Sequence, residues 1–273
     1  MRKLIWAAVP LAFAISTPAC ADDDQPCDDS MVAAVSQWAG IKGNLAPWGD
    51  KDGLVAAAAC KVMPNAPDTT VAAIAFDTGH VGPNSQDGNL ARVVALVEGG
   101  KVVAANHSVI EQDALTQVGS FRIDTAPYQL SPEVRAFGVV FNSSAHGPSC
   151  PDAGADRELT LFVRDAHALR PVFGTNLQGW VAVDEGTCGS GTAGARSEDA
   201  DMTIAVEKTS SHGFADLALT AHVTRNRLEN QQWVVTGKRT KRIVLKYDGK
   251  SYGIDMFRNF WYPNEGIWAR HGK

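Results

Sequence analysis

Residues 91–105 read ARVVALVEGGKVVAA, and this stretch decides the fold class. Two apolar runs rich in β-branched residues, Ala91–Val97 and Val102–Ala105, stand on either side of the pair Gly99-Gly100. A Gly-Gly pair between two such runs predicts a two-residue hairpin, because glycine readily adopts the positive φ that this turn requires. The stretch therefore predicts two adjacent antiparallel strands.

Short runs of apolar and β-branched residues, separated by turn residues, continue from Thr69 towards the C-terminus, as is typical of antiparallel sheet. Asp248-Gly249 predicts a second two-residue hairpin. Nearly all connections are too short for the crossovers of a parallel sheet. We expect an all-β fold of antiparallel strands, in a propeller-like or a sandwich arrangement. The predicted strands are Val71–Phe76, Ala91–Val97, Val102–Ala105, Ser120–Asp124, Ala136–Phe141, Glu158–Arg164, Gly179–Val183, Met202–Glu207, Ala215–Val223, Trp233–Thr236, Arg242–Tyr247 and Ser251–Ile254.

The region before these strands has a different pattern. Ser30 is expected to cap a short helix, Met31–Trp38, whose apolar residues recur near helical spacing. Glycine and proline residues follow and end the helix. We therefore expect residues 22–67 to form a small helical N-terminal cap and residues 68–273 to form the antiparallel β domain.

Residues 1–21 have the composition of a cleaved signal peptide for export. Arg2 and Lys3 precede an apolar run, and Ala19-Cys20-Ala21 is similar to a signal peptidase site. The apolar run is shorter than the roughly 20 residues that cross a bilayer, so we expect no transmembrane span after cleavage. The expected location is the periplasm or the outside of the cell. The alternative is a lipoprotein that stays anchored through Cys20.

Cleavage after Ala21 would remove Cys20 and leave an even number of cysteines. In an oxidising compartment these are expected to form two disulfides. Four cysteines allow three pairings. We favour Cys27 with Cys60 and Cys150 with Cys188, since each pair then stays within one neighbourhood of the chain.

The charge balance limits the classes of partner. The chain carries 25 basic and 30 acidic residues, and its net charge is -5 at pH 7. This balance argues against a nucleic-acid-binding protein, for which a basic face would be expected. The sequence also lacks the glycine-rich loops that hold phosphate groups, and we expect no cofactor.

The stretch SHGFADL at residues 211–217 resembles the end of an FG-GAP repeat, the turn and strand of integrin-like β-propellers. The stretch KYDGKSY at residues 246–252 is similar to the closing hairpin of exported propeller-like proteins. The calcium loop of the family is missing, because no run of alternating aspartates precedes Gly213. The resemblance implies a propeller-like blade without calcium binding. In overall texture the chain also resembles exported proteins of proteobacteria.

Motifs for catalysis or metal binding are weak. Asp50 and Asp52 belong to an Asp-Lys-Asp-Gly stretch that lacks the further ligands of a calcium loop, so a plain turn is expected. The histidines stand apart at spacings that do not indicate zinc. We therefore assign no catalytic, cofactor or metal site. One enzymatic alternative stays open, a hydrolase in which two strand carboxylates meet in a cleft. Its candidates are Asp124, Glu158, Glu207 and Asp216.

Two clusters suggest a partner surface. The C-terminal tail carries Trp261, Tyr262 and Trp268 among basic residues, a composition that favours interfaces or sugar stacking. The alternative is that this tail packs back and completes the core. The second cluster is a basic stretch that includes Arg239 and Arg242 and is expected on the exposed face of a hairpin. Such a face would attract an acidic protein or an envelope polymer.

Taken together, these features favour an exported, non-catalytic protein that binds or inhibits a partner. Its binding groups would be loops on a disulfide-linked β scaffold. The partner is expected to be a protein or an envelope polymer. The two alternatives are a carboxylate-dependent envelope hydrolase and a lipid-anchored structural protein of the envelope.

Overall fold

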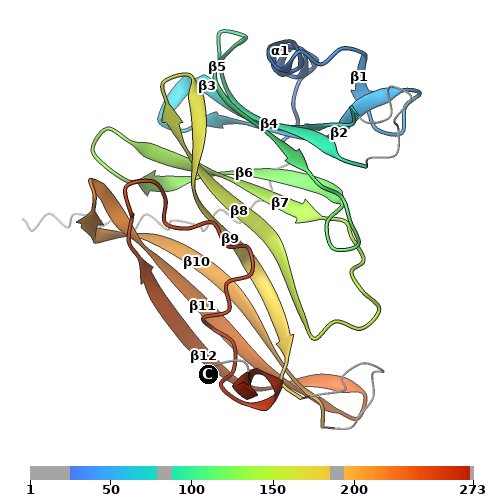
Figure 1. Ribbon diagram of the computed structural model, residues 1–273, viewed down its shortest axis with the longest axis vertical. Coiled ribbons are helices and arrows are strands. Elements are labelled where there is room, and N and C mark those ends of the chain that lie inside the picture. The colour runs from blue at the N-terminus through green and yellow to red at the C-terminus, as the bar shows by residue number, and fades with distance from the viewer. Residues whose placement is uncertain (1–24, 79–87, 185–193, 271–273) are drawn as a thin grey trace, which may run out of the picture.

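The computed structural model describes residues 25–78, 88–184 and 194–270 of the 273-residue chain. In these parts the strands form one large mixed sheet, and a single short α-helix lies at the N-terminal end (Figure 1). The expected all-β class with a small N-terminal helix is confirmed. The elements are α1 (Asp29–Ala39), β1 (Asn44–Pro47), β2 (Gly53–Met63), β3 (Ala66–Phe76), β4 (Leu90–Glu98), β5 (Lys101–Ile110), β6 (Val118–Gln129), β7 (Arg135–Ser143), β8 (Ala153–Asp165), β9 (Ala168–Ala182), β10 (Arg196–Ser211), β11 (Phe214–Glu229), β12 (Gln232–Leu245) and the 3-10 helix η1 (Gly266–Arg270).

The sheet runs in the order β1-β2-β3-β4-β5-β9-β10-β11-β12, and β6, β7 and β8 form a branch attached to β9. Because the order begins at β1 and ends at β12, the sheet does not close on itself. Most neighbours are antiparallel as expected, but β1 lies parallel to β2, and β5 meets β9 in parallel at Ala105 and Ala168. In Figure 1, β2 to β5 lie at the top, β6 to β9 in the middle and β10 to β12 at the bottom.

The hairpin from which the fold was predicted is present. Gly99 and Gly100 both have positive φ, 54° and 74°, and this conformation is the one that twists two antiparallel strands together. Glu98 and Lys101 pair directly before and after the turn. The prediction for this stretch is confirmed.

Two differences from the expected strands have physical reasons. Residues 53–63, which we placed in the N-terminal cap, form β2 and pair with β3. The run of alanines in β2 carries no β-branched signal, so only its pairing with β3 makes it a strand. The predicted strands Trp233–Thr236 and Arg242–Tyr247 are parts of one long strand, β12, because the polar residues between them also pair with β11.

The last predicted strand, Ser251–Ile254, is instead part of an irregular segment. Asp248-Gly249 does form a turn, in which the backbone nitrogen of Asp248 donates to the carbonyl oxygen of Ser251 over 3.1 Å. Ile254 makes an isolated bridge to Gly174 of β9. We call residues 248–270 the C-terminal segment.

Three hydrophobic clusters hold the layers together. The first lies between α1 and the sheet of β2 to β5 and includes Val35 and Ile74. The second lies between that sheet and β6 to β9 and includes Phe121 and Phe162. The third lies between β8 to β11 and the C-terminal segment and includes Trp261. Each strand from β2 to β11 thus has residues that face the core on one side or both, which fits the apolar runs of these strands.

The disulfide expected between Cys27 and Cys60 is confirmed, with the Cα atoms 4.9 Å apart. It ties Cys27, the residue before the N-cap of α1, to β2. Cys150 is also disulfide-bonded, and Cys188, its expected partner, lies outside the described residues. The expected signal peptide, residues 1–21 with Cys20, lies outside them as well.

Helix α1 begins earlier than expected. Asp28, not Ser30, is the N-cap, and its carboxylate accepts a hydrogen bond from the backbone nitrogen of Met31 over 2.7 Å. The hydrogen bond that the hydroxyl of Ser30 donates to this carboxylate, together with the one from Met31, lowers the pKa of Asp28. The helix ends at Gly40, which has a φ of 71°, a conformation that glycine adopts without strain.

Candidate functional site

Trp261, Tyr262 and Trp268 pack back against the core, whereas Phe257 of the same segment leaves 66% of its surface exposed. Trp261 has 1% of its surface exposed. Its ring packs edge-on against Tyr262, with the centroids 4.8 Å apart, and Tyr262 packs edge-on against Trp268 at 4.6 Å. The indole Nε1 of Trp268 donates a hydrogen bond to the carbonyl oxygen of Ala182, 2.6 Å away. The tail therefore packs back on the end of β9.

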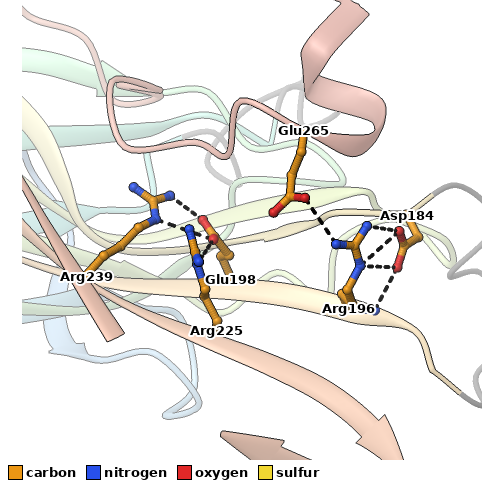
Figure 2. Close-up of polar contacts among 6 residues, drawn as sticks. All are labelled: Asp184, Arg196, Glu198, Arg225, Arg239 and Glu265. Atoms are coloured by element: carbon orange, nitrogen blue, oxygen red, sulfur yellow. Dashed lines mark hydrogen bonds and ion pairs between the residues drawn. The ribbon is translucent and has the colours of Figure 1, made fainter. Parts of the chain in front are cut away.

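A buried carboxylate lies next to Trp261. Glu198 of β10 has 2% of its side chain exposed, and Nε of Arg225 on β11 donates to its Oε1 over 2.9 Å. Arg239 of β12 pairs with the same carboxylate (Figure 2). Arg239 also donates a hydrogen bond to the carbonyl oxygen of Trp261. Two guanidinium groups thus compensate the charge of Glu198. Burial of this carboxylate without them would be costly. Arg239, which the sequence placed on an exposed face, therefore binds within this cluster.

A second group of charges holds the far end of the C-terminal segment (Figure 2). Nη2 of Arg196 lies 2.6 Å from Oδ1 of Asp184, and its Nη1 lies 3.2 Å from Oε2 of Glu265. Hydrogen bonds from Arg196 lower the pKa of Asp184. The backbone nitrogen of Ile267 donates to the carbonyl oxygen of Val183 over 3.0 Å. Both charge groups of Figure 2 therefore serve to hold the segment in place.

Two of the four carboxylates of the hydrolase alternative, Asp124 and Glu158, lie on opposite faces of the branch formed by β6, β7 and β8. Asp124 faces the third hydrophobic cluster, where it accepts a hydrogen bond from the hydroxyl of Tyr128 over 2.8 Å. Asp124 of β6 pairs with Gly138 of β7, and Glu158 of β8 pairs with Phe141 of β7. Since Gly138 and Phe141 are three residues apart, the two carboxylates are separated by about 10 Å along the strands, and further across them. That exceeds the roughly 5 to 9.5 Å between the acids of a glycosidase. The structure does not bring this pair together.

The other two carboxylates lie on β10 and β11 and have partners of their own. Glu207 of β10 pairs with Arg242 of β12. Asp216 of β11 is 3% exposed and accepts a hydrogen bond from the hydroxyl of Thr209 over 2.7 Å. Hydrogen bonds from hydroxyl groups lower the pKa of Asp216. The first contact joins β10 to β12 across β11, and the second joins β10 to β11.

Glu158 has the most unusual environment among these acids. Burial raises its pKa, whereas the charge of Arg92 lowers it. Burial also lowers the pKa of Arg92, which donates from Nε to the hydroxyl of Ser108 over 2.9 Å. The two opposite charges attract each other in a partly buried region where β2 to β5 pack against β6 to β9. This arrangement accounts for both shifts through packing alone.

The turn expected at residues 50–53 is present. The backbone nitrogen of Gly53 donates to the carbonyl oxygen of Asp50 over 3.0 Å, and Asp52 has a φ of 60°. Within residues 25–78, 88–184 and 194–270, no group of three or more His, Cys, Asp and Glu side chains is placed to hold a metal ion.

The most distinctive surface is β12, the last strand of the sheet order. None of its residues is buried, and residues 232–236 are exposed at every position. The side chains of Trp233, Val234 and Val235 leave 54%, 42% and 55% of their surface exposed. Three consecutive apolar residues with this much exposed surface are unusual, and they make this end of β12 a candidate contact surface.

The backbone of β12 is paired along one edge alone. That edge pairs with β11 from Gln232 to Leu245. Along the other edge, no backbone group hydrogen-bonds to the backbone of any residue that the structure describes. An edge of this kind is a template on which another strand can form hydrogen bonds. We call it the β12 edge.

The sequence located part of this surface. It identified the basic stretch with Arg239 and Arg242, but it divided β12 into two short strands and so missed the length of the edge. One signal was available. Asn230 and Gln231, with φ of 51° and 65°, make a two-residue turn of the primed type, and asparagine is among the residues that favour it.

No helix in the described parts of the chain is long and apolar enough to cross a membrane. No family model matches the chain, and no curated protein and no solved structure is significantly similar to it.

Proposed function

We propose that this chain is an exported, non-catalytic binding protein that captures a partner protein through the β12 edge. One observation carries the proposal: an unpaired backbone edge, exposed apolar side chains and a basic segment occur together on one strand. Extended protein segments bind to such edges as an added strand. Main-chain hydrogen bonds then supply affinity, and the alternating side chains supply specificity.

The mode of binding differs from the one expected from the sequence. We expected loops to contact the partner, whereas the surface with these properties is a strand. The C-terminal aromatic residues contribute by packing behind β10 and β11. They give β12 a rigid support, so the edge is already ordered before a partner binds, and less conformational entropy is lost on binding.

Export is supported by the composition of residues 1–21 and by the disulfide between Cys27 and Cys60. Disulfides persist in the periplasm and outside cells and are rare in the cytosol. Mass spectrometry of the protein from its native cells tests this part. A mature chain that starts at Asp22 supports the free exported form. An acylated Cys20 supports the anchored form. A chain that still begins at Met1 argues against export.

Site-specific cross-linking tests the β12 edge. A photo-reactive residue replaces Thr236 or Thr240 of β12, or, as controls, the exposed Val109 or Leu115 elsewhere on the surface. In native cells we expect one discrete partner band from the two β12 positions. That band should be absent from the control positions. If all four positions give the same bands, or if the β12 positions give none, the proposal is refuted.

A further inference from the structure

We infer that the segment which adds to β12 is an extended, acidic stretch of another protein, whose carboxylates face Lys238 and Lys241; this inference rests on the proposed function. The free edge alone does not indicate the chemistry of the partner, whereas the two lysines do.

The charges of β12 are only half compensated within the chain. Arg239 pairs with Glu198, and Arg242 pairs with Glu207. Lys238 and Lys241 stand between and beside these arginines, and no ion pair to either lysine is found among the described residues. Since β12 has no acidic residue, these two charges are left for a partner to neutralise.

The register assigns the two lysines to opposite faces of the sheet. Lys238 is opposed to Thr224 and Lys241 to Ala221, and these residues of β11 are three apart. Side chains alternate between the two faces of a strand, so positions three apart point to opposite sides. A strand that pairs with β12 would therefore carry one carboxylate on each face, three residues apart.

The exposed apolar side chains extend the same pattern. Val235 is opposed to Asn226 and Lys238 to Thr224, and these two residues of β11 are two apart and therefore on the same face. Val235 and Lys238 share that face although they are three residues apart, because a bulge at Thr236, which has no opposed residue on β11, shifts the register. On that face the added strand would meet Val235 near the hairpin tip and Lys238 further along. Protection against unwanted pairing explains lysines on an edge. It does not explain the exposed valine and tryptophan beside them.

A second copy of this chain fits the edge poorly. If two β12 strands paired antiparallel about Thr240, Lys238 of one copy would oppose Arg242 of the other, and Lys241 would oppose Arg239. Like charges directly opposite each other destabilise a pair of strands. An acidic segment gains attraction at the same two positions. Charge complementarity therefore favours an acidic partner over a homodimer.

Peptide binding to the full mature chain tests the inference. The probe is a fluorescein-labelled peptide of twelve alternating valines and threonines, with glutamate at two central positions three residues apart. Matched peptides carry glutamine or lysine at those two positions. We expect the glutamate peptide to bind at least about tenfold more tightly than the glutamine peptide, and we expect added salt to reduce that difference.

Charge reversal in the protein provides the control. The double variant Lys238→Glu/Lys241→Glu should lose the preference for the glutamate peptide and gain a preference for the lysine peptide. Lys51→Glu/Lys101→Glu changes the net charge equally at exposed positions away from β12 and should leave the preference unchanged. Circular dichroism confirms that both double variants are folded.

The outcomes separate this inference from the proposed function. If the glutamate and glutamine peptides bind equally while cross-linking still occurs at β12, the acidic preference is refuted and capture by the edge stands. If the mature chain is a dimer in sedimentation and Lys238→Glu/Lys241→Glu changes the dimer constant, the occupant is a second copy and the inference is overturned. If cross-linking also fails, both proposals fall.

Discussion

At the scale of single residues, the pairing of Glu158 with Arg92 predicts a pH dependence of stability. Burial raises the pKa of Glu158 in the folded chain above its value in the unfolded chain. A raised folded pKa contributes stability that is complete below the unfolded pKa and is lost as the pH rises through the folded pKa. The charged form of Glu158 is thus the less favourable one in this environment.

Glu158→Gln keeps the shape of the side chain and removes the titration. We expect the free energy of unfolding of the parent chain, relative to that of Glu158→Gln, to decrease between about pH 4 and about pH 7. Urea unfolding at both pH values measures it. A difference that stays constant would show that attraction to Arg92 fully offsets the burial.

At the scale of elements, the C-terminal segment depends on a close backbone approach. Gly266 has a φ of 65°, and a Cβ atom at this position would lie 1.8 Å from the carbonyl oxygen of Val183. Gly249 also has a positive φ, 97°, but a Cβ atom there would meet no other atom within 4 Å. The two glycines share the conformational constraint and differ in the steric one.

We expect Gly249→Ala to lower the free energy of unfolding by about 1 kcal/mol through backbone strain. Gly266→Ala should cost at least about 2 kcal/mol more, because the overlap displaces the segment from β9. Limited proteolysis should then cut residues 248–270 in Gly266→Ala and leave Gly249→Ala intact. Equal stability losses would contradict the proposed docking of η1 on Val183.

The strand β12 shows what local sequence patterns can predict and what they cannot. Its two ends were predicted from β-branched and aromatic residues, and its basic residues were assigned to an exposed face. The polar centre gave no strand signal of its own. It is a strand because each residue pairs with β11, which is a property of the neighbour and not of the local sequence.

At the scale of the whole molecule, one sheet connects β1 to β12 without a break in its order. The disulfide between Cys27 and Cys60 closes a loop with a sequence separation of 33 residues at one end of this sheet. The chain-entropy argument gives such a bridge about 3 to 4 kcal/mol of stability. Because the sheet is continuous, its effect should reach distant strands.

We expect Cys27→Ser/Cys60→Ser to lower the free energy of unfolding by about 3 kcal/mol and to speed amide exchange equally in β3 and β11. Hydrogen exchange resolved by mass spectrometry measures both strands in one experiment. Faster exchange in β3 alone would show that β10 to β12 unfold as a separate unit.

The sequence alone was sufficient for the all-β class, the N-terminal helix and the Gly99-Gly100 turn, and it favoured the disulfide between Cys27 and Cys60 among three possible pairings. These features depend on local periodicity, on residues that tolerate positive φ and on the number of cysteines.

Only the tertiary structure decided that β2 joins the sheet, that Trp261 is buried against the Glu198 cluster and that β12 is left with a free edge. Burial and pairing depend on which segments lie side by side. That is set by contacts between residues far apart in the chain, and a local pattern does not contain it.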